Sequence, residues 1–352
     1  MPPVTLPPGV ATRRRRRQQV VAALAAGLGL ALVAGILHGS VSLGAAEVWA
    51  ALIGWRGGEG ASPQHHAIIV LLRLPRVLLA AVAGAALATG GAVLQGMFRN
   101  PLVDPGLLGV SSGAAVGAVL AIALRAPLTF PWAVPAAAFA GGTLAVAAVT
   151  LLARTGSRTS LPVLLLAGLV VSSLGGSVVS VLITVTQPFS VAQEILFWLM
   201  GSLHGRRWEH LSLAAPPALG ATVALWLFAR PLNLLLAGEE EAAALGMNVE
   251  RLKVALLGLT ALAVGSAVSV TGTIGFVGLM VPHLLRFLAG GDHRWLLPAS
   301  SLGGATFLVM ADLVARTALR PMELPVGVVT ALVGVPFFLV LLVRGRREVG
   351  RW

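Results

Sequence analysis

The chain is 352 residues long, 57% hydrophobic and only 11% charged, with a mean hydropathy of +0.90 and a formal net charge of +12. Soluble domains carry about 25% charged residues, so this composition excludes a mostly water-facing surface. It also argues against a nucleic-acid binder, which would cluster its cations on one polar face, because long stretches here hold no charge. Cysteine is absent, which excludes disulfides, thiolate metal sites and cysteine nucleophiles.

Uncharged apolar runs of membrane-spanning length recur along the chain. A spanning helix needs about 20 apolar residues, and in lipid it must pair its backbone polar groups internally, so these runs predict helices rather than strands. The run 254–285 is too long for one span, and its Gly and Thr residues between Val270 and Gly278 predict a break. The expected fold is an all-α integral membrane protein of about ten spans, near 18–38, 76–97, 107–124, 131–153, 160–185, 210–229, 252–271, 275–290, 297–318 and 324–343.

The distribution of arginine predicts the topology. A basic arm, 1–17, precedes the first apolar run, which reaches Ile36 and is longer than a usual signal-peptide core, so we expect an uncleaved first span. Ten spans place both termini on one side, and the cations of the arm and near the tail 345–352 place that side in the cytoplasm. The segment 18–344 is then a single ten-span membrane domain, and its outward-facing arginines break the usual charge bias.

Two short helices are expected outside the spans. The first, 191–202, follows Gln187-Pro188 and suits a membrane interface. The second, 232–246, lies in the cytoplasmic loop 230–250: Gly238 precedes three glutamates, which favour the positive first turn of a helix, and Gly246 suits a left-handed cap after its last turn. Such a helix is either a docking element for a partner or an ordinary interfacial loop helix.

Three stretches carry the strongest motifs. The first joins Arg73-Leu74-Pro75-Arg76, where Pro75 is expected to fix the start of a span, to Arg99-Asn100-Pro101 through Gly109. The second is Arg230 to Gly246, and the third runs from Gly275 through Pro282-His283 and Ala311-Asp312 to Phe338. Together, from about Leu71 to Arg344, they resemble the permease subunits of the iron-siderophore, haem and cobalamin ABC importers, the type II importer fold.

The resemblance implies partners and roles. It implies a homodimer in the lipid bilayer, two cytoplasmic ABC ATPase subunits docked on the 230–246 loop, and a periplasmic or lipid-anchored substrate-binding protein outside. It implies ATPase coupling by Arg230, Leu232, Asn233, Gly238, Glu239, Ala242, Leu245 and Gly246. It implies binding-protein docking by Arg73, Arg76, Arg316 and Arg320. Structural or gating roles fall to Asn100, Pro101, Pro282, His283, Arg286 and Asp312.

Some of these residues keep a second interpretation. Asp312 and Arg316 lie four apart and share a helix face, so they either dock or gate, or stabilise a helix end as a pair. His283 and Arg286 lie three apart without further ligands nearby in the chain, so packing or ATPase contact is favoured over a metal site. We therefore expect the chain to bind no metal.

The chain carries no phosphate-binding loop. No Gly-x-x-x-x-Gly-Lys-Ser/Thr segment occurs and the single lysine is Lys253, so ATP and magnesium are expected to act in a partner subunit and no cofactor in this chain. We predict a channel-forming subunit of an ATP-driven importer in the bacterial inner membrane, not an enzyme, carrying ferric siderophore, with haem or cobalamin next. The alternative is an ion-coupled secondary transporter, for which only Asp312 is arguably placed within the membrane. A lipid-processing enzyme would need clustered acid–base groups, which the sequence lacks.

Overall fold

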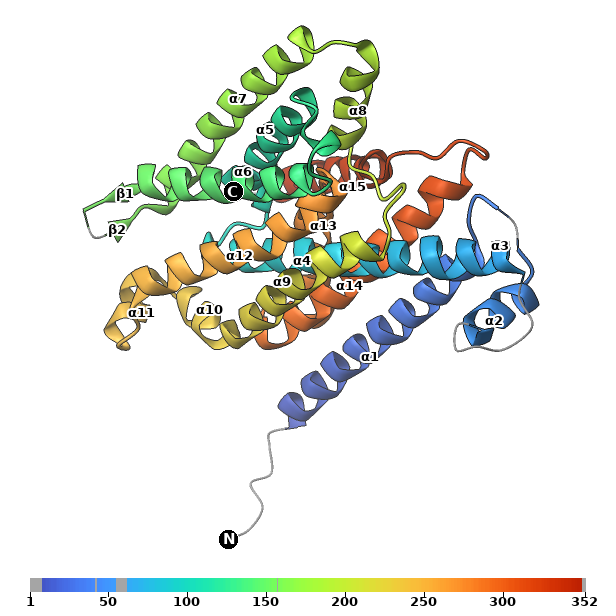
Figure 1. Ribbon diagram of the computed structural model, residues 1–352. Helices are drawn as coiled ribbons and strands as arrows, with labels where there is room; N and C mark the ends of the chain where they lie inside the picture. Colours follow the sequence, from blue (N-terminus) through green and yellow to red (C-terminus); the bar gives the residue numbers. More distant parts are fainter. Residues whose placement is uncertain (1–7, 42, 55–61, 157, 350–352) are drawn as a thin grey trace.

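Most of the chain that the structure describes is helical. The computed structural model describes residues 8–41, 43–54, 62–156 and 158–349 (Figure 1). In chain order its elements are α1 (Pro8–Leu37), α2 (Ala45–Gly54), α3 (Pro63–His66), the π-helix η1 (Ala67–Arg73), α4 (Leu74–Met97), the 3-10 helix η2 (Pro105–Leu108), α5 (Val110–Ala123), the 3-10 helix η3 (Ala126–Leu128), α6 (Ala133–Leu152), β1 (Arg154–Thr155), β2 (Arg158–Thr159), α7 (Leu161–Val185), α8 (Phe189–Leu199), α9 (Trp208–Leu227), α10 (Ala229–Leu235), α11 (Glu239–Ala244), α12 (Val249–Thr271), α13 (Val277–Ala289), α14 (His293–Thr317) and α15 (Val326–Val349). Residues 1–7 of the predicted arm and 350–352 of the predicted tail lie outside the described residues.

Ten of these helices fall on the ten segments expected to span a membrane: α1, α4, α5, α6, α7, α9, α12, α13, α14 and α15. The largest differences are that α1 begins at Pro8, so that the arginines of the predicted arm are helical, and that α15 continues to Val349. Seven of the described helices are long and apolar enough to cross a membrane, and α5, α8, α13 and the first part of α15 are shorter apolar helices. The expected all-α membrane fold is confirmed.

Three segments differ from the expectation in detail. The segment before Pro75 is helical, and α3, η1 and α4 follow one another without a break; Pro75 lies in the first turn of α4, where a missing N–H is tolerated. The expected 232–246 helix is two helices, α10 and α11, separated at Gly238, whose φ of 146° strongly favours glycine. The residues between α6 and α7 form a two-residue antiparallel hairpin, β1–β2.

Small residues let helix α4 lie at the centre of the molecule. Every residue from Ala83 to Met97 is buried, against α9, α12, α13 and α14. A Cβ placed on Gly84 would lie 2.2 Å from the carbonyl oxygen of Gly304 in α14, and one on Gly91 would lie 1.8 Å from that of Gly278 in α13. Helices that associate in lipid without a hydrophobic driving force use such close backbone contacts.

The predicted break between α12 and α13 is present. Helix α12 ends at Thr271, and a non-helical segment leads from it to α13. Gly272 and Phe276 in this segment both have positive φ angles. The hydroxyl of Thr273 in this break donates to the Leu199 carbonyl at the end of α8, and Ser202 donates its backbone N–H to the Thr271 carbonyl at 2.8 Å. The break therefore joins α8 to α12.

The helices run mostly lengthwise, so the bundle has two ends (Figure 1). One end holds α10, α11, the β1–β2 hairpin and the start of α14. The other holds α2, α3, the loop 200–207 that follows α8, and the loop 318–325 between α14 and α15. We refer to them as the α10 end and the α8 end.

Candidate functional site

Helix α10 is tied to neighbouring helices through one asparagine. Asn233 donates through Nδ2 to Asp292 Oδ1 at 2.7 Å and accepts at Oδ1 from the backbone N–H of His293 at 2.9 Å. Asp292 caps α14 and pairs with Arg294 at 3.0 Å and with Arg17 of α1 at 3.3 Å. Partial burial opposes ionisation of Asp292, but hydrogen bonds from Arg294 and Asn233 outweigh it and hold its pKa at about 2. One carboxylate thus joins α1, α10 and α14.

Helix α11 is held in place by Lys253 of α12. The lysine Nζ donates to Glu239 Oε2 at 2.6 Å, to Glu250 Oε1 at 3.1 Å and to the Thr159 carbonyl at 2.8 Å. Its side chain is 1% exposed, so these acceptors replace the water that a buried ammonium loses. Because Glu239 is the first residue of α11 and Thr159 belongs to β2, one cation connects α11, α12 and the hairpin.

The side chains predicted to couple to an ATPase divide into two groups. Leu232 and Ala242 are 0% exposed and belong to the apolar core beneath the loop. Arg230 and Gly246 are exposed, and the Leu245 side chain is 72% exposed. Direct contact with a partner is therefore open to Arg230, Leu245 and Gly246, whereas Leu232 and Ala242 fix the shape of the loop from inside.

At the α8 end, Asp312 is the centre of a buried ionic cluster. Arg76 donates to Asp312 through Nε at 3.0 Å and through Nη2 at 2.8 Å, and its Nη1 donates to Glu323 at 2.8 Å. Arg316 lies one helical turn from Asp312 and pairs with it at 3.3 Å. The Asp312 side chain is only 1% exposed. Buried charges are tolerated when they are paired in this way, so the cluster stabilises the contact of α4 with α14.

Arg73 and Arg316 also bind the end of α1. Arg73 donates to the Ile36 and Leu37 carbonyls at 2.9 and 3.0 Å, and Arg316 donates to the Gly35 carbonyl. The last carbonyls of a helix have no partner inside the helix, so these arginines provide one.

Most of the arginines predicted to dock a binding protein do not face outward, contrary to the expectation. Arg73, Arg76 and Arg316 are 5%, 9% and 2% exposed, and the partners that their charges require lie within the chain. The sequence analysis kept an Asp312–Arg316 pair as one alternative, but it missed the other contacts because their partners are up to 281 residues away. Arg320 alone of the four is exposed, in the turn after α14. Docking remains a prediction for all four residues.

The turn between α4 and α5 contains the next candidates. Asn100 accepts at Oδ1 from the Leu102 N–H at 2.9 Å, as expected of a residue that bonds free backbone groups beside Pro101. Asp104, which had no assigned role, caps η2 by accepting from the Gly106 N–H at 2.8 Å, and burial raises its pKa to about 6. These contacts indicate a structural role for the turn.

The candidates on α13 lie among aromatic side chains. The ring of His283 is edge-on to Phe287 at 5.1 Å and to Phe337 at 6.3 Å, while Pro282 is buried and Arg286 half-buried. Within the described parts of the chain no three His, Asp or Glu residues gather to hold a metal ion. The surroundings of His283 favour packing as its role.

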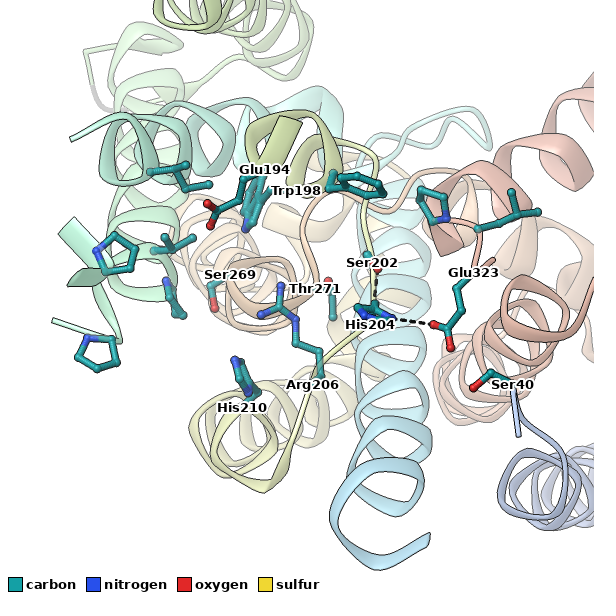
Figure 2. Close-up of a pocket in the computed structure, with 18 of the residues that line it drawn as sticks. Ser40, Glu194, Trp198, Ser202, His204, Arg206, His210, Ser269, Thr271 and Glu323 are labelled. Carbon is teal, nitrogen blue, oxygen red and sulfur yellow. Dashed lines mark hydrogen bonds and ion pairs between the residues drawn. The ribbon is translucent and has the colours of Figure 1, made fainter. Parts of the chain in front are cut away.

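A cavity of about 750 Å³ opens at the α8 end (Figure 2). It lies between α8, the loop 200–207, the start of α9, the end of α12 and the loop 318–325. Its polar lining residues are Ser40, Glu194, Ser202, His204, Arg206, His210, Ser269, Thr271 and Glu323. An apolar wall comes mainly from prolines, from Ile122 and Val134, and from the aromatic residues Phe197 and Trp198 of α8.

A contact between two loops lies at one side of this cavity. His204 Nδ1 lies 2.9 Å from Glu323 Oε2, and the same carboxylate oxygen accepts from Arg76 (Figure 2). Partial burial opposes the charge of Glu323, but the hydrogen bond with His204 and the attraction of Arg76 lower its pKa. Sequence reasoning gave none of the cavity residues a binding role, because residues from six separate segments form the lining.

The fold and these sites define a multi-pass helical membrane protein of the transport class: its helices enclose a cavity with polar and apolar walls at one end and support a charged loop, held by hydrogen bonds, at the other. The chain belongs to the FecCD transport family, whose model matches residues 23–344. It is therefore a type II importer permease, as its sequence motifs predict.

Relatives with names of their own share most of the chain. It is 48% identical over 287 residues to the cobalamin import system permease protein BtuC of Halobacterium salinarum, covering 80% of this chain and 75% of that protein. It is 46% identical over 280 residues to the hemin transport system permease protein HmuU of Yersinia pestis, covering 79% of this chain and 83% of that protein.

A solved structure has the same fold. It is described as an inward-facing conformation of a metal-chelate type ABC transporter, and its superposition has a TM-score of 0.80 at 35% identity. The match covers 93% of this chain and 99% of that one. The likeness thus includes the helices of both ends.

Proposed function

We propose that this chain is the channel-forming subunit of an ATP-driven importer for a metal chelate. In this proposal two copies form the pathway, two separate ABC ATPases supply the force, and a substrate-binding protein delivers the cargo. Membership of the permease family supports the proposal. The chain lacks a phosphate-binding loop, so ATP and magnesium act in the ATPase subunits.

The observation that carries the proposal is an exposed surface of α10 and α11 whose helices are hydrogen-bonded to α12 and α14. Leu234 and Leu245 are 42% and 72% exposed there, beside the exposed acidic side chain of Glu240. Exposed apolar side chains with a charged rim are typical of a surface that binds another protein. Beneath them, Asn233 and Lys253 connect α10 and α11 to α12 and α14, so a push on this surface would move whole helices rather than bend a loop.

The same end is proposed to face the cytoplasm of a bacterial cell. Arg14, Arg15 and Arg16 are exposed near the beginning of α1, and the contact of Arg17 with Asp292 places this part of α1 at the α10 end. Cations gather in cytoplasmic segments of membrane proteins. Arg76 and Arg316 at the α8 end form ion pairs inside the chain and so do not oppose this orientation.

For the cargo we propose a metal chelate of the haem or cobalamin kind, with ferric siderophores as the second choice. This order reverses the expectation from motifs, and the reason is that relatives of high identity are named for hemin and cobalamin. The cargo is identified by measuring the uptake of labelled haem, cobalamin and ferric siderophore into proteoliposomes that contain the complete transporter. Uptake without ATP, or by this chain alone, would contradict the proposal.

The coupling surface is tested by replacing Leu245 with aspartate. A charge at this exposed position should weaken association with the ATPase subunits about fivefold or more, because disrupting a central contact of an interface costs about 1 kcal/mol or more. Thermal stability should not change, since the side chain is 72% exposed. Serine at Val254, 53% exposed on the side of α12, serves as control. Full ATP-dependent uptake by the Leu245 variant would contradict the proposed role of this surface in coupling to the ATPase subunits.

An ion-coupled secondary transporter is not favoured. That interpretation depended on a free carboxylate within the membrane, and Asp312 is paired with both Arg76 and Arg316.

A further inference from the structure

Two hydrogen-bond donors that line the cavity at the α8 end have no acceptor in the part of the chain that the structure describes. The Nε atom of Arg206 and the Nε1 atom of Trp198 are both buried, and neither finds a hydrogen-bond partner among the described residues. In Figure 2, Arg206 extends from its loop into the middle of the cavity, toward the side where Trp198 lies. Buried polar groups are nearly always hydrogen-bonded, so two orphaned donors in one cavity indicate a ligand that accepts.

The charge of Arg206 indicates that this ligand is an anion. Arg206 is a guanidinium whose pKa is lowered by burial, and no ion pair compensates it within the described chain, unlike Arg76 and Arg316 nearby. Ser269 and Thr271 line the same cavity, but no hydrogen bond joins either hydroxyl to Arg206 within the described chain. A planar guanidinium binds a two-oxygen anion best, through paired charge-assisted hydrogen bonds.

Neither of the two glutamates that line the cavity forms an ion pair with Arg206. Glu323 is bound to Arg76 and His204. Glu194 lies on α8 and is exposed, and it forms no ion pair with Arg206 within 4.0 Å. Its negative charge works against an incoming anion, so it limits the affinity of the site.

We propose that Arg206, assisted by the indole N–H of Trp198, binds a carboxylate on the rim of the imported chelate. This inference rests on the proposed function and narrows its cargo. Haem carries two carboxylates and fits the site, as do siderophores with free carboxylates, whereas the rim of cobalamin carries neutral amides in their place. The cavity of about 750 Å³ has an apolar wall beside the donors, which suits the flat apolar face of such a ligand.

The test is equilibrium binding of haem and of haem dimethyl ester to the purified full-length chain in lipid nanodiscs, followed by haem absorbance. The wild-type chain should bind haem about tenfold or more tightly than the ester, because the ester removes both anions. Arg206→Gln should abolish this preference and Arg206→Lys should keep part of it. Arg207→Gln, at an exposed neighbour that does not line the cavity, should retain the whole preference.

Several results would overturn the site. They are equal binding of haem and its ester, no haem binding by the wild-type chain, or an unchanged preference in Arg206→Gln. Competition by inorganic phosphate as effective as haem itself would show a general anion site instead. Glu194→Gln should bind haem at least as tightly as the wild type, and weaker binding would count against the assigned charges. ATP-dependent uptake by the complete transporter is measured separately, so failure of the importer proposal is distinguished from failure of this site.

Discussion

Replacing Asp312 by asparagine tests whether the arginines at the α8 end are structural. The change keeps the volume and one oxygen acceptor of the side chain but removes the charge that Arg76 and Arg316 share. Breaking a buried ion pair typically costs about 3–5 kcal/mol, because the remaining charge is left without compensation. Glu323 still binds Arg76 at 2.8 Å in the variant, so we expect the lower end, about 3 kcal/mol of unfolding free energy.

The free energy is measured by titrating the purified protein with SDS in mixed micelles and following tryptophan fluorescence. The matched control is Arg294→Gln, which breaks the ion pair of an arginine side chain that is 58% exposed and should leave the unfolding free energy close to that of the wild type. A loss below about 1 kcal/mol for Asp312→Asn would refute the reasoning, since it would mean that the cluster is solvated or dispensable.

The same assay separates structural from docking roles among the four arginines. Arg76→Glu should destabilise the chain by a similar or larger amount, because it places like charges beside Asp312. Arg320→Glu, at an exposed turn, should leave the unfolding free energy within about 0.5 kcal/mol of the wild type. If Arg320→Glu nevertheless weakens association with a substrate-binding protein, docking is assigned to Arg320. An Arg76→Glu variant of normal stability would restore the docking hypothesis for Arg76.

Three further outcomes are expected. Gly91→Ala should cost about 1–3 kcal/mol of stability, because its Cβ would lie 1.8 Å from a carbonyl of α13; Gly176→Ala, with nothing within 4 Å, should be neutral or stabilising in the same SDS titration. Leu232→Ala should cost about 2–5 kcal/mol, since the side chain is 0% exposed, and a neutral result would deny its burial. Asp292 has a pKa lowered from 3.8 to about 2, so its stabilisation, at most about 2 kcal/mol, is present above pH 4 and lost as the pH falls toward 2. The measurement is the difference in unfolding free energy between the wild type and Asp292→Asn from pH 4 to pH 2. A difference that does not change with pH would contradict the assigned role of Asp292.

The sequence alone determined the local features of this protein. Continuous apolar runs predict helices wherever lipid forbids unpaired backbone groups, and this constraint acts on each segment separately. For the same reason the break after Thr271 and the opening of α11 by Gly238 were predictable, since glycine and threonine act within a few residues.

Tertiary structure decided which charges and side chains are available to partners. Arg76 and Asp312 are 236 positions apart, and nothing in the spacing of either residue reveals that α4 and α14 bring them together. Leu232 and Leu245 are leucines of the same cytoplasmic-loop prediction, yet one is enclosed by the core and the other is exposed. The orphaned donors of Arg206 and Trp198 likewise became visible only when distant segments formed a shared cavity. Burial and pairing are properties of several helices at once, so the folded arrangement determines them.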